Sequence, residues 1–486
     1  MIKKLLFTCI VILCIVPLTA QNITEAVYES YENYKEKSLD NRRIKHHQLQ
    51  PLIDNYSGNT KFLVTKVGAS IQGRDLNLIT IGSGETNIFL WSQMHGDEPT
   101  ATQAIFDLLN FFDSDDFKVE KKSILENLTL HFLPMLNPDG AEVFQRRNAL
   151  GIDINRDALR LQSPEGRTLK RVRDSLDAAF GFNLHDQSTY YNAERTEKPA
   201  SISYLATAYN YEKEINEVRA NAMKVIVFMN DIIQKYAPGQ VGRYNDDFEP
   251  RAFGDNIAKW GTSLILIESG GFANDIEKQE IRKLNYVSIL SALYTIANKS
   301  YLDIAIEDYE KIPHNDRNLF DLKIENVTFE INGKDYILDL GINRQEIDLE
   351  GQNQFYNKSV IIDQGDLSTY YGYETFDAAG YKIVTPKLKN NAQEIFEFKM
   401  PIKLLKEGFA YVRSTLPRKG FSTNKPIHIV GDNYRLKPFK LAPGENPTFF
   451  LEKDEMVTHA IINGFILDLQ KPFEQQKFGN ALLYRD

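Results

Sequence analysis

The sequence predicts an α/β protein with a mixed, mostly parallel sheet and helices on both faces, followed by a β-rich, sandwich-like region. Up to about residue 298, strand-like apolar segments alternate with helix-like segments. That alternation is typical of a mostly parallel sheet covered on both sides. After residue 298, short alternating runs separated by turn residues favour a β-sandwich. The chain therefore divides into two regions of different architecture.

The length and composition are those of a globular protein of two or three domains. The chain has 486 residues, 42% of them hydrophobic and 25% charged, which allows a large core. We predict a signal peptide at 1–20, an α/β domain at 21–300 and a charged linker at 301–318. The β-rich accessory region at 319–486 would form one unit or two small β modules.

The first twenty residues have the layout of a secretory signal peptide. Lys3 and Lys4 precede an uncharged apolar run that ends near Val16, and cleavage is expected after Ala20. The run is short for a membrane anchor, so we expect export to the periplasm or the exterior and no membrane span in the mature chain. Both cysteines, Cys9 and Cys14, lie in this leader.

The mature chain is acidic. The leader holds two of the 57 basic residues and none of the 66 acidic ones, so its removal leaves a net charge of −11. Because nucleic-acid binding depends on a surplus of positive charge, nucleic acid is excluded as a partner.

The elements of the first region follow from apolar periodicity. Strands are expected at 74–81, 87–91, 128–136, 180–184 and 262–267. Helices are expected at 24–37, from about 43, after Thr100, and at 165–179, 212–235 and 276–298.

Polar residues follow these strands where each one ends. His95 and Glu98 come after the second strand, His185 follows the fourth, and Glu268 follows the fifth. In sheets of this kind the ligand site lies beyond the carboxyl ends of the strands. By itself the H-x-x-E spacing of His95 and Glu98 is also compatible with a polar turn and a helix-capping acid. Convergence of four such residues at one sheet edge favours a site.

Several ordered motifs complete the pattern. The segment HGDE holds His95 and Glu98, NPDG follows the third strand, and GIDINR ends at Arg156. In this order, with the later His185 and Glu268, the motifs resemble those of the zinc metallocarboxypeptidase family that includes carboxypeptidase A. The resemblance covers roughly residues 26–298 and suggests a secreted bacterial branch.

The resemblance implies one Zn²⁺ held by His95, Glu98 and His185, with an open position for water. It implies that Glu268 is the general base and that Arg146 stabilises the oxyanion, with Arg147 as the alternative. Further roles are implied for substrate-binding and supporting residues. The substrate's terminal carboxylate would meet Asn155 and Arg156, the mobile substrate-binding tyrosine would be Tyr244, and the acid that orients the first histidine would be Asp153.

We therefore expect a secreted zinc carboxypeptidase that removes the C-terminal residue of a peptide. Eighty-six residues lie between Glu98 and His185, fewer than in the digestive enzymes, so shortened loops are expected around the specificity pocket. Two alternatives stay open on the same scaffold: a peptidase of cell-wall stem peptides, and an amide deacylase. A third is a catalytically inactive zinc protein that binds peptide or glycan.

The second region contains apolar runs but no site pattern. Strands are expected at 323–331, 334–340, 358–363, 394–400, 410–414, 427–430 and 460–467, and Asn332-Gly333 indicates a hairpin turn. The tyrosine-rich segment 367–376 is interpreted mainly as packing, with carbohydrate or peptide binding as the alternative.

Overall fold

The computed structural model describes residues 20–349, 354–390, 399–413, 422–423, 425–472 and 481–482. The predicted signal peptide lies outside these residues except for Ala20, which begins helix α1 (Ala20–Glu29). Within the described chain, no helix combines the length and the apolar character needed to cross a membrane.

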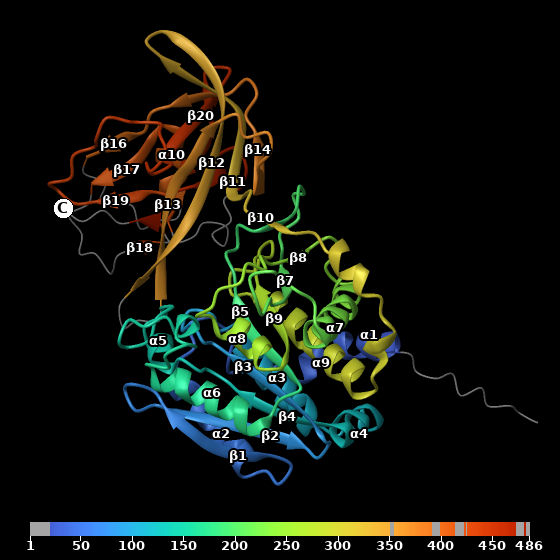
Figure 1. The fold of residues 1–486 in the computed structure, drawn as a ribbon. Coiled ribbons are helices and arrows are strands. Elements are labelled where there is room, and N and C mark those ends of the chain that lie inside the picture. The colour runs from blue at the N-terminus through green and yellow to red at the C-terminus, as the bar shows by residue number, and fades with distance from the viewer. Residues whose placement is uncertain are drawn as a thin grey trace, which may run out of the picture.

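An eight-stranded mixed sheet forms the centre of the first region (Figure 1). Its four central strands are parallel, and the pairings β1–β2, β2–β4 and β9–β7 are antiparallel. The predicted mixed, mostly parallel sheet is thus confirmed. In spatial order the strands are β1 (Leu63–Ala69), β2 (Asp75–Gly82), β4 (Leu128–Leu133), β3 (Thr86–Ser92), β5 (Phe180–Asp186), β9 (Ser263–Ser269), β7 (Ile202–Ala206) and β8 (Val241–Arg243).

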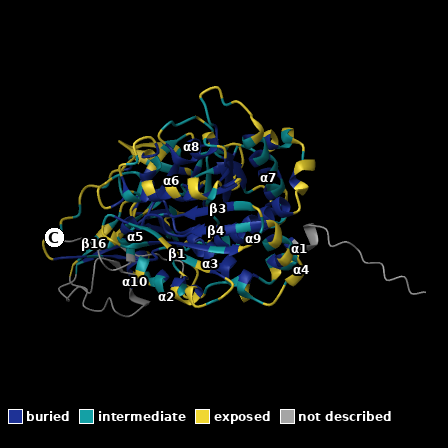
Figure 2. Ribbon diagram, turned by 60° about the horizontal axis from the view of Figure 1, so that its bottom comes forward, coloured by how far each residue is buried: buried dark blue, intermediate teal, exposed yellow. Residues whose placement is uncertain are grey.

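Helices cover both faces of this sheet, as predicted, because its central strands are apolar on both sides. Figure 2 shows the central strands in the colour of buried residues, whereas the helices also carry exposed ones. One face packs against α1, α2 (His46–Ser57), α3 (Thr100–Asp113), α4 (Lys118–Asn127), α7 (Glu217–Ile233) and α9 (Gln279–Ala297). The other face packs against α6 (Pro164–Leu176) and α8 (Phe253–Lys259).

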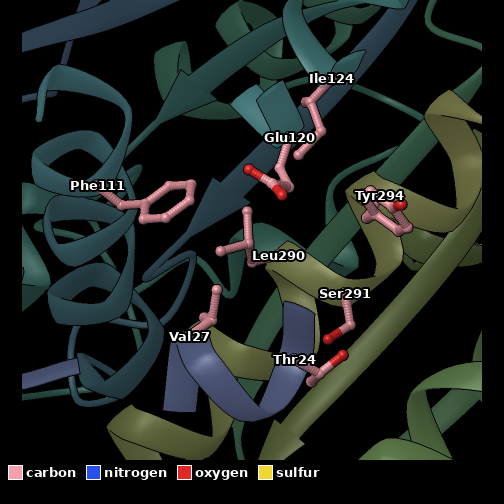
Figure 3. Close-up of a pocket in the computed structure, with 8 residues that line it drawn as sticks. All are labelled: Thr24, Val27, Phe111, Glu120, Ile124, Leu290, Ser291 and Tyr294. Carbon is pink, nitrogen blue, oxygen red and sulfur yellow. The ribbon is translucent and has the colours of Figure 1, made fainter. Parts of the chain in front are cut away.

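A small cavity lies within the helical layer, away from the predicted site. It is lined by side chains of α1, α3, α4 and α9, among them Val27, Phe111, Ile124 and Leu290 (Figure 3). Most of this lining is apolar, and none of the predicted site residues belongs to it.

The second region is β-rich, as predicted. Its large sheet has the order β13-β12-β11-β15-β20-β21-β22, with β14 paired to β11. These strands are β11 (Leu319–Ile331), β12 (Lys334–Leu349), β13 (Gln354–Gly365), β14 (Tyr371–Asp377), β15 (Lys382–Val384), β20 (Phe449–Lys453), β21 (Met456–Ile462) and β22 (Phe465–Asp468). Asn332 and Gly333 both have positive φ in the predicted hairpin turn between β11 and β12.

Smaller elements complete this region. A three-stranded sheet contains β16 (Lys387–Lys389), β17 (Phe409–Arg413) and β19 (His428–Val430), and a two-stranded one pairs β18 (Ser422–Thr423) with β23 (Ala481–Leu482). The prediction of a strand at 394–400 was wrong for its last two residues, because helix α10 (Lys399–Lys406) begins there. The rest of that strand lies outside the described residues.

The segment expected to be a linker, 301–318, packs on the first region. It contains the short helices η3 (Ser300–Asp303) and η4 (Ile306–Lys311), and strand β10 (Asn315–Asp316) pairs with β6 (Asn192–Ala193). Tyr309 and Ile312 are buried in the same apolar cluster as α7 and α9. The charged residues that suggested a linker alternate with these buried side chains.

Candidate metal centre

The loop between β3 and α3 carries His95 and Glu98. Gln93 turns the chain out of the strand with φ of 51°, and its side-chain amide donates to the Gly96 carbonyl at 2.9 Å. Glu98 N then donates to the His95 carbonyl at 3.2 Å. Glu98 therefore lies in a tight turn just before α3.

Two glycines allow this loop to pack against the NPDG segment. NPDG forms the short helix α5 (Pro138–Glu142), and Asn137 caps it by accepting a hydrogen bond from Gly140 N at 3.0 Å. A Cβ atom on Gly96 would overlap the backbone of Gly140 and Ala141. The close approach of two backbones thus explains the glycines in HGDE and NPDG.

Strand register brings His185 and Glu268 together. The two residues are direct partners in the parallel pair β5–β9, so their side chains leave the sheet on the same face. Both are buried, with exposed fractions of 3% and 8%. The sheet edge therefore presents a histidine and an acid next to the loop of His95 and Glu98.

His95, Glu98 and His185 form one cluster. The Nδ1 atom of His95 lies 2.8 Å from Glu98 Oε1, and the Nδ1 atom of His185 lies 2.7 Å from Glu98 Oε2. The candidate ligand atoms of the three residues lie within 4.8 Å of one another, and this is the one such cluster found among the described residues. Two imidazoles and a carboxylate match the donor set of a catalytic zinc site.

The buried groups of the cluster shift one another's pKa values. Although burial opposes ionisation, His95 and His185 hold the pKa of Glu98 well below its usual range. Although burial alone would lower it, Glu98 and Asp153 raise the pKa of His95 to about 9. A metal ion held here would displace the proton of His95 and take over the balancing of the buried Glu98 charge.

Glu268 has the opposite behaviour. Burial, together with the nearby Glu98 carboxylate, raises its pKa well above the usual range for a glutamate. A carboxyl group with a raised pKa, placed beside these three candidate metal ligands, is suited to accepting and returning a proton.

Arg146 belongs to the cluster, and Arg147 is directed elsewhere. Arg146 donates to Asp153 Oδ2 at 3.0 Å, and its Nη1 lies 3.1 Å from His95 Nδ1. Asp153 Oδ1 also lies 3.3 Å from His95 Nε2, as expected for an acid that orients this histidine. The exposed Arg147 instead donates to the Gly151 carbonyl at 2.9 Å.

Asn155 and Arg156 lie in the short helix η2 (Ile154–Arg156), which Asp153 caps. Asn155 Oδ1 accepts a hydrogen bond from Phe253 N at 2.9 Å, so its side chain links η2 to α8. Arg156 lies on the surface and its Nε is 3.4 Å from Glu249 Oε2. The pair is thus connected to the cluster through Asp153, and Arg156 already has a carboxylate neighbour.

Tyr244 lies beside the cluster. Burial and the nearby Glu268 carboxylate raise its pKa, and its ring meets that of Tyr191 edge-on at 6.0 Å between centroids. Tyr191 belongs to the loop after His185, and the sequence pattern did not single it out.

The sequence also did not reveal a buried ion pair behind the cluster. Lys278 Nζ lies 2.9 Å from Asp186 Oδ2 and donates to the Ser269 carbonyl at 2.9 Å. These contacts join the residue after His185 to the residue after Glu268. Asp186 directly follows a predicted ligand, but nothing in the sequence indicated Lys278 as its partner.

The sequence pattern of the zinc carboxypeptidase family matches residues 49–231. Residues 49–231 thus form a zinc carboxypeptidase domain, which is 183 of the 486 residues of the chain. The matched span includes His95, Glu98 and His185.

Curated relatives of this carboxypeptidase domain match over short segments. Carboxypeptidase SOL1 of Arabidopsis thaliana is 34% identical over 99 residues, which are 19% of this chain and 20% of that protein. Probable carboxypeptidase 2 of Trichophyton verrucosum is 29% identical over 136 residues, 28% of this chain and 25% of that protein. The chain thus spans a fifth to a quarter of these two relatives' length.

Solved structures are similar at lower identity. A metallo-carboxypeptidase from Burkholderia cenocepacia aligns with a TM-score of 0.43 and 15% identity, covering 52% of this chain and 69% of that one.

Proposed function

We propose that this protein is a zinc-dependent carboxypeptidase that hydrolyses the last peptide bond of a substrate with a free terminal carboxylate. The proposal depends on one observation, the convergence of His95, Glu98 and His185 within 4.8 Å beside the buried Glu268. The family match supports it. A zinc ion held by these three residues would supply a water of lowered pKa and polarise the scissile carbonyl.

The chain's own groups supply the rest of the reaction. Glu268 accepts the proton of the attacking water and passes it to the leaving amine, a role favoured by its raised pKa. The Arg146 guanidinium, held by Asp153, stabilises the negative charge that develops on the carbonyl oxygen.

Asn155 and Arg156 receive the terminal carboxylate, which selects the end of a peptide chain over its interior. A planar guanidinium is well suited to this task. Arg156 is partly exposed and lies near Glu249, so an incoming carboxylate would compete with this glutamate. Tyr244 covers the bound substrate next to Glu268 in this proposal.

We further propose that the protein is exported, since the first twenty residues have the charge and apolar pattern of a signal peptide. Peptides outside the cytoplasm, including cell-wall peptides with a free carboxylate, are then the available substrates.

The decisive test replaces Glu268 with Gln and compares the variant with the wild type on peptides that differ in their last residue. We expect the wild type to release that residue and to contain one zinc ion per chain. Glu268→Gln should keep the zinc and lose about 10²–10⁴-fold in kcat, because the proton acceptor is removed. Mass spectrometry of the products and metal analysis give both readouts.

A buried glutamate outside the cluster provides the control. Glu165 is fully buried and accepts hydrogen bonds from Ile71 N and Asn148. Glu165→Gln should keep the activity of the folded protein.

Removal of zinc by a chelator should abolish hydrolysis, and added zinc should restore it. Equal activity of Glu268→Gln and wild type would contradict the mechanism, and a zinc-loaded wild type inactive on all peptides would favour a binding protein.

A further inference from the structure

The β-rich region reaches the loop that carries Arg146. Figure 1 shows the end of β12 and the start of β13 beside α5, far from the turn that joins β11 and β12. The contact is made through Arg43, a buried residue of the segment before α2 with an exposed fraction of 5%.

Arg43 is held on two sides by side chains of this hairpin. Its Nη2 lies 2.9 Å from Glu346 Oε2 and 2.7 Å from Asp348 Oδ1, and its Nε donates to the same Asp348 oxygen at 2.9 Å. The paired Phe355 of β13 stacks on the guanidinium at 4.3 Å. Both charge and ring contact therefore fix Arg43 to the β-rich region.

The same guanidinium also lies over the ring of Phe144, whose centroid is 4.4 Å away. Phe144 is two residues before Arg146 and has a φ of 49°, a left-handed conformation that is unfavourable for a bulky side chain. Such a conformation persists only where surrounding contacts determine it. The stack on Arg43 is one contact that can do so.

The contact between Arg43 and Phe144 matters for Arg146 because the Arg146 side chain is only partly packed. Its side chain is 42% exposed, and Asp153 is its closest carboxylate partner at 3.0 Å. Asp153 holds the guanidinium. The backbone of the loop is held at Arg146 by the Asn137 amide, which donates to the Arg146 carbonyl at 3.2 Å, and at Phe144 by the contact with Arg43. Oxyanion stabilisation is sensitive to the placement of the donor, since a shift of about 1 Å can cost a large factor in rate.

The β-rich region also contacts the other loop of the site, the one after His185. Tyr190 donates from its hydroxyl to Asp321 Oδ2 at 2.8 Å, and Tyr373 donates to the Thr189 carbonyl at 2.6 Å. The next residue, Tyr191, meets Tyr244 beside Glu268. Two loops of the candidate site are thus attached to the same β-rich region.

We propose that Arg43 is a positioning residue for Arg146: clamped by Glu346, Asp348 and Phe355, it fixes Phe144 and so sets the loop that presents the oxyanion guanidinium. The β-rich region then contributes to catalysis by holding the loop that carries Arg146. The expected fall in kcat rests on the proposed carboxypeptidase function. The expected effect on the loop that carries Arg146 rests only on the contacts of Arg43.

The test uses the full chain with Arg43→Met, which removes the charge and keeps much of the apolar length. We expect kcat to fall about tenfold or more, with KM changed less than about twofold, because Arg146 acts on the transition state and not on the bound substrate. Zinc content should stay at the wild-type level. Hydrogen exchange of residues 143–148 should become faster.

Arg173→Met is the matched control. Arg173 is also buried, but it binds Thr262 and the Trp260 carbonyl beside the start of β9, away from the metal cluster. This variant should keep kcat and the slow exchange of residues 143–148 even if its stability is lower. A positioning role is contradicted if Arg43→Met matches this control in both readouts.

A second variant approaches the clamp from the β-rich side, in case Arg43→Met does not fold. Asp348→Asn should lower kcat and speed the same exchange, and its effect should not add to that of Arg43→Met, since both break the Arg43–Asp348 contact. Glu346 is left unchanged because it also binds Arg42 at 2.7 Å. Fully additive effects would overturn the proposal. If the wild type hydrolyses no peptide, the carboxypeptidase function fails separately, and the exchange of residues 143–148 still decides whether the clamp holds the loop.

Discussion

At the scale of single residues, neighbouring arginines have different surroundings. Arg146 donates to Asp153 and lies beside His95, whereas Arg147 donates to the Gly151 carbonyl on the surface. The sequence offered both as the oxyanion arginine, because the two are adjacent and spacing alone does not show which way each side chain turns. The hydrogen bonds of the folded chain separate them.

Replacing Arg146 with Met should therefore lower kcat by about 10²–10³-fold, since a charged donor aimed at the developing oxyanion is lost. Arg147→Met should leave kcat within about twofold of wild type, because an exposed side chain that bonds a surface carbonyl contributes little. Steady-state kinetics of the two variants, with zinc content measured in each, checks this pair. A larger loss for Arg147→Met would reassign the oxyanion role.

The metal cluster could be predicted from the sequence because each of its members follows an apolar strand. His95, Glu98, His185 and Glu268 occupy the ends of β3, β5 and β9, and the parallel register of β5 and β9 brings the last two together. Lys278 and Tyr191 could not be predicted in the same way. Lys278 lies where α9 begins, and Tyr191 lies in the loop after His185. The spacing of apolar residues predicts neither the exact start of a helix nor the path of a loop.

At the scale of elements, the strands and helices of the first region were predicted best where they are long and apolar. Strand β9 is buried along its whole length, and α9 corresponds to the helix expected at 276–298. Strands β7 and β8 were not predicted, since they have five and three residues and lie toward the edge of the sheet. The sequence predicted a mixed sheet but not which strands pair antiparallel, because local sequence does not specify strand direction.

The packing of the HGDE loop on α5 gives a test at this scale. Gly96→Ala should destabilise the protein by about 1–3 kcal/mol, because the added methyl group overlaps the backbone of Gly140. It should also weaken zinc binding, since the loop that holds His95 and Glu98 must move. Denaturant unfolding and chelator competition provide the measurements.

Gly58→Ala serves as the comparison for that variant. Gly58 follows α2 with a φ of −82°, and the nearest atom to an added Cβ would be 3.6 Å away. This change should leave zinc affinity unaltered and stability equal or slightly higher. Equal behaviour of the two glycine variants would show that the close approach of the loop and α5 is not required.

At the scale of the whole molecule, the two regions are joined by packed chain. The segment 301–318, expected to be a linker, packs along α7 and α9 before the first strand of the β-rich sheet begins. Tyr309 is 1% exposed, its hydroxyl accepts a hydrogen bond from Ala206 N at 3.0 Å, and Arg243 lies over its ring. The charged residues that suggested a linker lie on the exposed side of this segment, whereas Tyr309 and Ile312 lie on its buried side.

Tyr309→Ala in the full chain should therefore lower the free energy of unfolding by about 3–5 kcal/mol, the cost of removing a large buried ring. Tyr336, a tyrosine of β12 that is 49% exposed, gives the comparison: Tyr336→Ala should change the same quantity by less than about 0.5 kcal/mol. Denaturant unfolding followed by circular dichroism measures both. A segment that merely links two regions would make the two variants equal, because neither ring would then leave a cavity. A large loss for Tyr309→Ala alone would instead mean that the first region is complete only when residues 301–318 are folded onto it, so that its physical boundary lies near residue 318 and not near residue 300.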